Sequence, residues 1–169
     1  MRRALDALYD GAAALAALAM VLLLVAVLAS VLGRQFHFNL PGTDAYAGYM
    51  MAAAGFLALA HTFKRGEHIR VTLLLQSLAP GARHRLELWA FSAASLLAGL
   101  VAYYSLRLAW QSHAFNDIST GNDATPLWLP QLGMAIGTTI LAIACVDELV
   151  LEWRGQRAEL PSGEALRNE

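Results

Sequence analysis

Four long stretches without a charged residue constrain this chain more than any other feature. They cover residues 11–33, 45–63, 88–106 and 124–146, and they are 23, 19, 19 and 23 residues long. An α-helix rises about 1.5 Å per residue, so about 20 residues cross a hydrocarbon core about 30 Å thick. Each stretch fits one crossing. We therefore expect an all-α integral membrane protein with four transmembrane helices, near residues 11–33, 45–63, 88–106 and 126–146.

The composition agrees with a membrane protein and argues against other classes. Hydrophobic residues make up 57% of the 169 residues and charged residues only 15%, against about 25% charged in soluble domains. The net charge of −1 shows no basic excess that would suggest a nucleic-acid partner. The single cysteine, Cys145, excludes an internal disulfide. We expect one membrane domain over residues 1–154 and a polar cytoplasmic tail over residues 155–169.

The basic residues predict how the helices are oriented. With four crossings, only Arg34 and Arg107 of the 12 Lys and Arg residues fall on one side, which leaves ten on the other. Because cytoplasmic segments carry the excess of Lys and Arg, both termini are expected in the cytoplasm. A cleaved signal peptide is the alternative for the first stretch, but signal cores are usually about 7–15 residues long.

The segments between the stretches carry further signals. On the inner side, apolar residues between 69 and 79 recur at helical spacing beside a basic flank, which predicts a short amphipathic helix on the membrane surface. On the outer side, Thr125 and Pro126 read as a cap residue and a proline in the first helical turn. Each tryptophan lies at an expected membrane boundary, where indole rings favour the headgroup level: Trp89, Trp110, Trp128 and Trp153.

The sequence offers little that could perform chemistry. It has no nucleotide-binding loop, nucleophile elbow or zinc-protease motif. A haem would need histidines at matching depth in two helices, and only His61 lies in a predicted span. The spans also lack the intramembrane charges that a stand-alone transporter or exporter uses to bind its cargo. We therefore expect a non-enzymatic scaffold or accessory subunit without a metal or cofactor site.

A few residues are still candidates for structural or subunit contacts. Arg34 and Asp44 could form an ion pair at the outer corner between the first two spans. Glu67, His68 and Arg70 follow the second span, as an ordinary solvated face or as an anchor for the interfacial helix. Gly133 and Gly137 have the spacing of a close helix contact, either within the chain or against another subunit.

Several motifs together resemble the small membrane subunit of tripartite ATP-independent periplasmic (TRAP) transporters. The most specific is Gly66-Glu67-His68-Ile69-Arg70-Val71 after the second span, and weaker ones are Leu40-Pro41-Gly42-Thr43-Asp44 and Thr125-Pro126-Leu127-Trp128. The likeness covers about residues 10–150. Asp44 stands where the family often has Glu, and Ala135 stands where a proline is common.

The resemblance implies a division of labour between three proteins. The large membrane subunit would carry the substrate and sodium, and a periplasmic binding protein would deliver an organic acid. This chain would be a static small permease subunit in the bacterial inner membrane, with the bilayer and these two proteins as its partners and no cofactor of its own. The alternative from another class is the membrane anchor of a respiratory-type enzyme complex.

Overall fold

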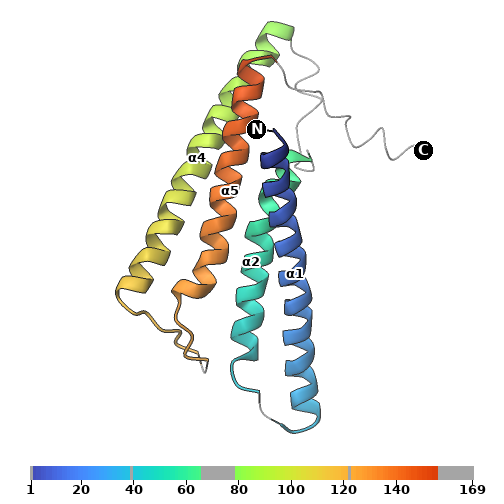
Figure 1. Ribbon diagram of the computed structural model, residues 1–169, viewed down its shortest axis with the longest axis vertical. Helices are drawn as coiled ribbons and strands as arrows, with labels where there is room; N and C mark the ends of the chain where they lie inside the picture. Colours follow the sequence, from blue (N-terminus) through green and yellow to red (C-terminus); the bar gives the residue numbers. More distant parts are fainter. Residues whose placement is uncertain (1, 39, 66–78, 122, 156–169) are drawn as a thin grey trace, which may run out of the picture.

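The computed structural model describes all residues except 1, 39, 66–78, 122 and 156–169, and helices make up most of the described chain (Figure 1). The helices are α1 (Arg2–Gln35), α2 (Thr43–Lys64), α4 (Pro80–Ala114) and α5 (Trp128–Trp153). In the described part, the β pairing consists of one isolated bridge between Ile118 and Pro126. The expectation of an all-helical protein is confirmed.

The helices lie side by side in the order α4, α5, α2, α1 (Figure 1). Each packs on its neighbours in this row, and α1 also makes a small contact with α5. Near the start of α1, Tyr9 and Ala12 join Ala60, Ile140 and Ala144 in a buried cluster. Because α2 and α5 are the two central helices, the seam between them holds the two halves of the row together.

The packing is inverted relative to a water-soluble protein. Small residues fill the contacts between helices, and they include Ala12, Ala16, Ala19, Ala98, Ala102, Ser105, Ala109 and Ser112. Large aliphatic residues point outward, such as Leu18, Val21, Leu24, Leu28, Leu96 and Leu97. In a bilayer, helices associate through close backbone approach while lipid solvates the large side chains. This arrangement therefore fits a membrane protein.

Three of the described helices are long and apolar enough to cross a membrane. They are α1 over Arg3–Gln35, α4 over Gly81–Ala114, and α5 over Trp128–Trp153. They correspond to the first, third and fourth expected spans. The helix α2 matches the second expected span in position but does not reach the same apolarity, so the count of four crossings stays a prediction.

The helix ends differ from the expected span ends. Helices α1 and α4 begin at Arg2 and Pro80, well before the expected starts at residues 11 and 88. Charged side chains limit a span but do not end a helix, because the backbone hydrogen bonds are made within the helix and charged groups can extend to water.

The predicted start of α5 is wrong. Pro126 pairs with Ile118 in the isolated bridge, and Leu127 N–H donates to the carbonyl of Asp117 at 3.0 Å. The helix begins at Trp128, with Leu127 at the N-cap and no capping hydrogen bond from a side chain. Thr125 and Pro126 therefore belong to the loop, whose own backbone contacts hold them outside the helix.

Two further expectations lie almost entirely outside the described residues. These are the interfacial helix near residues 69–79 and the polar tail over residues 155–169. The division into a membrane domain and a tail also stays a prediction.

Candidate functional site

The two glycines of α5 pack within the chain, against α2. A Cβ atom added at Gly133 would lie 2.9 Å from the Cβ of Ala53, and one at Gly137 would lie 2.5 Å from the carbonyl carbon and oxygen of Phe56. The sequence left open whether these glycines pack within the chain or against another subunit. In the structure they pack within the chain, at the α2–α5 seam. Their missing side chains let the central helices approach closely.

The expected ion pair between Arg34 and Asp44 is not formed at the outer corner between α1 and α2. Ser30 Oγ donates to Asp44 Oδ1 at 3.0 Å, and Arg34 Nε donates to the carbonyl of Ser30 at 3.5 Å. Among the described residues, no ion pair joins Arg34 to Asp44. Both residues nevertheless line the same small pocket of about 190 Å³, so the corner is linked through Ser30 instead of by a direct pair.

Glu67, His68 and Arg70 lie outside the described residues. Their expected role at the inner end of the second span stays a prediction.

A charged cluster that sequence reasoning missed lies between the end of α2 and the last third of α5. Lys64 Nζ is 2.6 Å from Asp147 Oδ2 and 2.8 Å from Glu148 Oε1. The same Nζ atom lies 5.5 Å from the centre of the Tyr9 ring on α1, within the range of a cation–π attraction. One lysine thus connects α1, α2 and α5. The sequence did contain one indication of this cluster. Lys64 and Asp147 each border a charge-free stretch, and the four-span prediction places both on the inner side of the membrane.

Two histidine–carboxylate contacts flank this cluster. His61 Nδ1 on α2 is 3.6 Å from Asp10 Oδ1 on α1. His84 Nδ1 on α4 is 2.8 Å from Glu152 Oε1 on α5. Together with Lys64, these contacts connect every neighbouring pair of helices in the row at this end. Within the described residues, no group of three or more His, Cys, Asp or Glu side chains could hold a metal ion.

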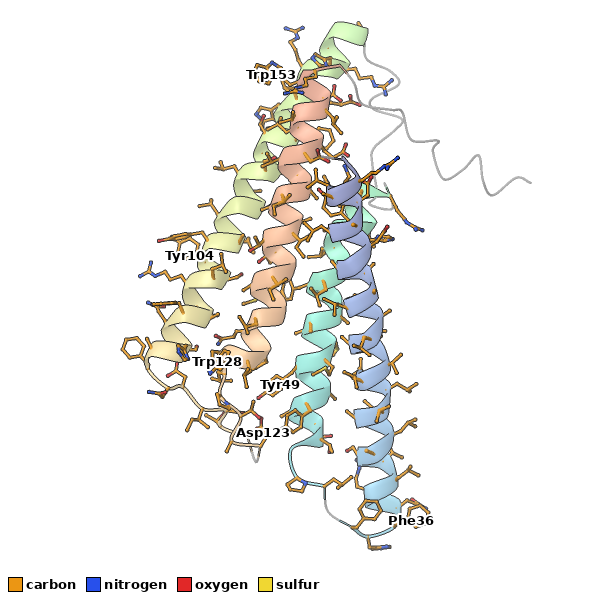
Figure 2. All side chains as sticks on the ribbon, in the orientation of Figure 1. Phe36, Tyr49, Tyr104, Asp123, Trp128 and Trp153 are labelled. Atoms are coloured by element: carbon orange, nitrogen blue, oxygen red, sulfur yellow. The ribbon has the colours of Figure 1, made fainter. Side chains whose placement is uncertain are left out.

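A second polar cluster connects the opposite end of α2 to the loop between α4 and α5. Tyr49 O–H lies 3.0 Å from both Ser119 Oγ and Asp123 Oδ2, and Ser119 Oγ donates to Asp123 Oδ1 at 2.8 Å. Figure 2 shows Tyr49 on α2 next to Asp123 in the loop between α4 and α5. The hydrogen-bonding side chains of Thr125, Ser119 and Tyr49 lower the pKa of Asp123 to about 2, so the carboxylate is ionised at neutral pH.

The described contacts tie α2 to its neighbours along its whole length. Polar contacts hold α2 at both ends, and glycine contacts hold it to α5 between them. No charged residue lies within the four stretches that separate the two ends.

A comparison with known families decides the identity. The family model described as the DctQ component of tripartite ATP-independent periplasmic transporters matches residues 23–155. The chain belongs to the DctQ family. This membership confirms the resemblance inferred from the motifs, because the match includes the loop after the second expected span and continues through α5. No curated protein matches the chain significantly.

Membership of the DctQ family identifies the chain as the small permease component of a TRAP transporter, a transmembrane transport protein. DctQ is a transporter component family and not a family of enzymes. The anchor of a respiratory-type complex gains no support from this match.

Proposed function

We propose that this DctQ component is the stator of its transporter: it holds the moving large subunit in place and does not bind the substrate. The observation that carries the proposal is the α2–α5 seam. Contacts at Lys64, at Gly137 and at Tyr49 leave the two central helices little freedom to slide. A carrier needs groups that bind cargo within the membrane, whereas a stator needs a rigid body.

We also propose that all four helices cross the membrane, with both termini in the cytoplasm. Helix α2 has 22 residues, which at about 1.5 Å per residue is enough for a 30 Å core. Its position between α1 and α5 supports a crossing, because neighbouring helices shield its less apolar faces from lipid (Figure 1). The Lys64 cluster and both histidine contacts would then lie at the cytoplasmic end, and the Tyr49 cluster at the periplasmic end.

The partners follow from the tripartite organisation of the family. A large permease subunit would carry an organic acid together with sodium, and a periplasmic binding protein would deliver the acid. The complex would lie in the bacterial inner membrane. Sodium coupling would reside in the large subunit, since this chain has no charged residue within the four stretches.

Co-purification tests the proposal directly. The full chain is expressed with its large permease subunit, and the tagged large subunit is isolated in detergent. We expect the two proteins to elute together, and uptake in proteoliposomes to require both. Failure of the two wild-type chains to associate would overturn the stator role.

A second test concerns Glu67, His68 and Arg70. We propose that this segment supports association with the large subunit or the placement of the interfacial helix. The double variant His68→Ala and Arg70→Ala is expected to reduce co-purification and uptake, while Arg154→Ala, another basic residue on the expected inner side, leaves both unchanged. Normal assembly and uptake of the double variant would contradict this role.

A further inference from the structure

An apolar groove runs along the contact between α4 and α5, on the half nearest the predicted periplasmic end. It is a shallow, open groove with a volume of about 290 Å³, which leaves room for one extended acyl chain. The lining is mostly apolar, and it consists of Leu100, Val101, Tyr104, Ser105 and Leu108 from α4 and Met134 from α5. We call this the α4–α5 groove.

A cation, Arg107, lies within one helical turn of the groove. Arg107 follows Tyr104 by three residues and Leu100 by seven, so its side chain starts on the same side of α4, one turn closer to Trp110. Arg107 is exposed, and among the described residues no carboxylate lies within ion-pairing distance of it. The exposed Trp110 indole, three residues further on, marks the headgroup level.

We propose that the α4–α5 groove binds one acyl chain of an anionic phospholipid whose phosphate is held by Arg107. The apolar lining matches the chain, and the guanidinium group offers paired donors that fit a phosphate. An arginine near the membrane surface attracts anionic lipids over zwitterionic ones. The apolar groove would therefore hold the lipid tail, and Arg107, closer to the membrane surface, would hold the headgroup.

A transmembrane helix of another subunit fits this groove less well. Close helix packing in lipid needs small residues on the contact face, and the small residues of α4 already face α5: Ala98, Ala102, Ser105, Ala109 and Ser112 are all buried. The outward face presents bulky side chains instead, including Tyr104, which points away from the row of helices (Figure 2). Flexible acyl chains conform to such a surface more readily than a rigid helix does.

Photo-crosslinking tests the site in the assembled protein. The full chain, co-purified with its large subunit, is placed in phosphatidylcholine vesicles that contain a trace of either phosphatidylglycerol or phosphatidylcholine with a photoreactive acyl chain. Labelled residues are then mapped by mass spectrometry. We expect the phosphatidylglycerol probe to label residues 100–108 about fivefold more than the phosphatidylcholine probe does. The outward face of α1, over residues 18–28, should show no such preference.

Matched variants separate the headgroup contact from the groove. Arg107→Gln should reduce labelling by the phosphatidylglycerol probe to the level of the phosphatidylcholine probe, whereas Arg154→Gln, at the opposite end of α5, should not. Val101→Trp should fill the groove and reduce labelling by both probes. Val21→Trp adds the same bulk to the exposed face of α1 and should leave labelling of the groove unchanged.

Two results would overturn the proposal. One is labelling of residues 100–108 that is no stronger than that of α1, as expected if another subunit covers the groove. The other is full phosphatidylglycerol labelling in a folded Arg107→Gln variant. Neither result bears on co-purification of the subunits, so the lipid site and the stator role are tested separately.

Discussion

Lys64 and Asp147 are 83 residues apart in the sequence, and their side chains meet at 2.6 Å. The contact joins the last residue of α2 to the last third of α5. Glu148 lies 2.8 Å from the same lysine nitrogen and is only 9% exposed. Lys64 thus contacts two partly buried carboxylates at the proposed cytoplasmic end of the helices.

Removing this cation should weaken the protein strongly. Lys64→Met removes the ion pairs to both carboxylates from a partly buried site, and we expect a loss of about 3 kcal/mol in the free energy of unfolding. Lys64→Arg keeps the charge and should lose less. Unfolding in a detergent gradient, followed by tryptophan fluorescence, measures the difference. Equal stability of Lys64→Met and the wild type would show that the cluster is not a structural contact.

The α2–α5 seam should not tolerate a methyl group at its closest point. In Gly137→Ala, the added Cβ meets the backbone of Phe56, which cannot rotate away as a side chain can. We expect a loss of about 3 kcal/mol. The control is Gly55→Ala on α2, because no atom lies within 4 Å of a Cβ added there. That variant should stay within about 0.5 kcal/mol of the wild type. Thermal unfolding of both variants in the same detergent tests this difference, and equal losses would contradict the close approach.

Tyr9 should contribute through its ring and not through its hydroxyl group. The side chain is buried in the cluster with Ala60 and Ile140, and its O–H has no hydrogen-bond partner among the described residues. Tyr9→Phe removes an unsatisfied polar group and keeps the ring beside Lys64, so stability should be unchanged or slightly higher. Tyr9→Ala should cost about 3–5 kcal/mol. A large loss in Tyr9→Phe, measured by the same unfolding assay, would mean that the hydroxyl group is bonded.

The contact between Asp123 and Tyr49 should depend on pH only under strongly acidic conditions. The pKa of Asp123 is lowered from 3.8 to about 2 in the folded protein. The ionised carboxylate therefore stabilises the fold fully above pH 3.8, and this contribution is lost as the pH falls towards 2. Asp123→Asn lacks the contribution at every pH. The stability difference between wild type and Asp123→Asn should stay constant from neutral pH to about 5 and shrink below 3.8. A difference that already shrinks near neutral pH would contradict the assignment.

The sequence by itself determined that the chain is a helical membrane protein, and it indicated the family. Charge-free stretches of 19 to 23 residues are long enough to cross a bilayer as helices, and the Gly66–Val71 motif already indicated the family that the family match confirms. These are local properties: whether a stretch is apolar, and which residues follow it, can be read without knowing what packs against it.

Only the tertiary structure decided which residues meet. The spacing of Gly133 and Gly137 suggested a close contact, but the partner was found to be α2 only once the order of helices in the row was known. Lys64 and Asp147 each mark the end of a charge-free stretch, and their pairing depends on the end of α2 lying level with Asp147, which is within α5. Helix order and relative height arise from many weak side-chain contacts summed along each seam. The total energy of these contacts depends on how the helix surfaces fit together in three dimensions, which no single stretch of the sequence encodes.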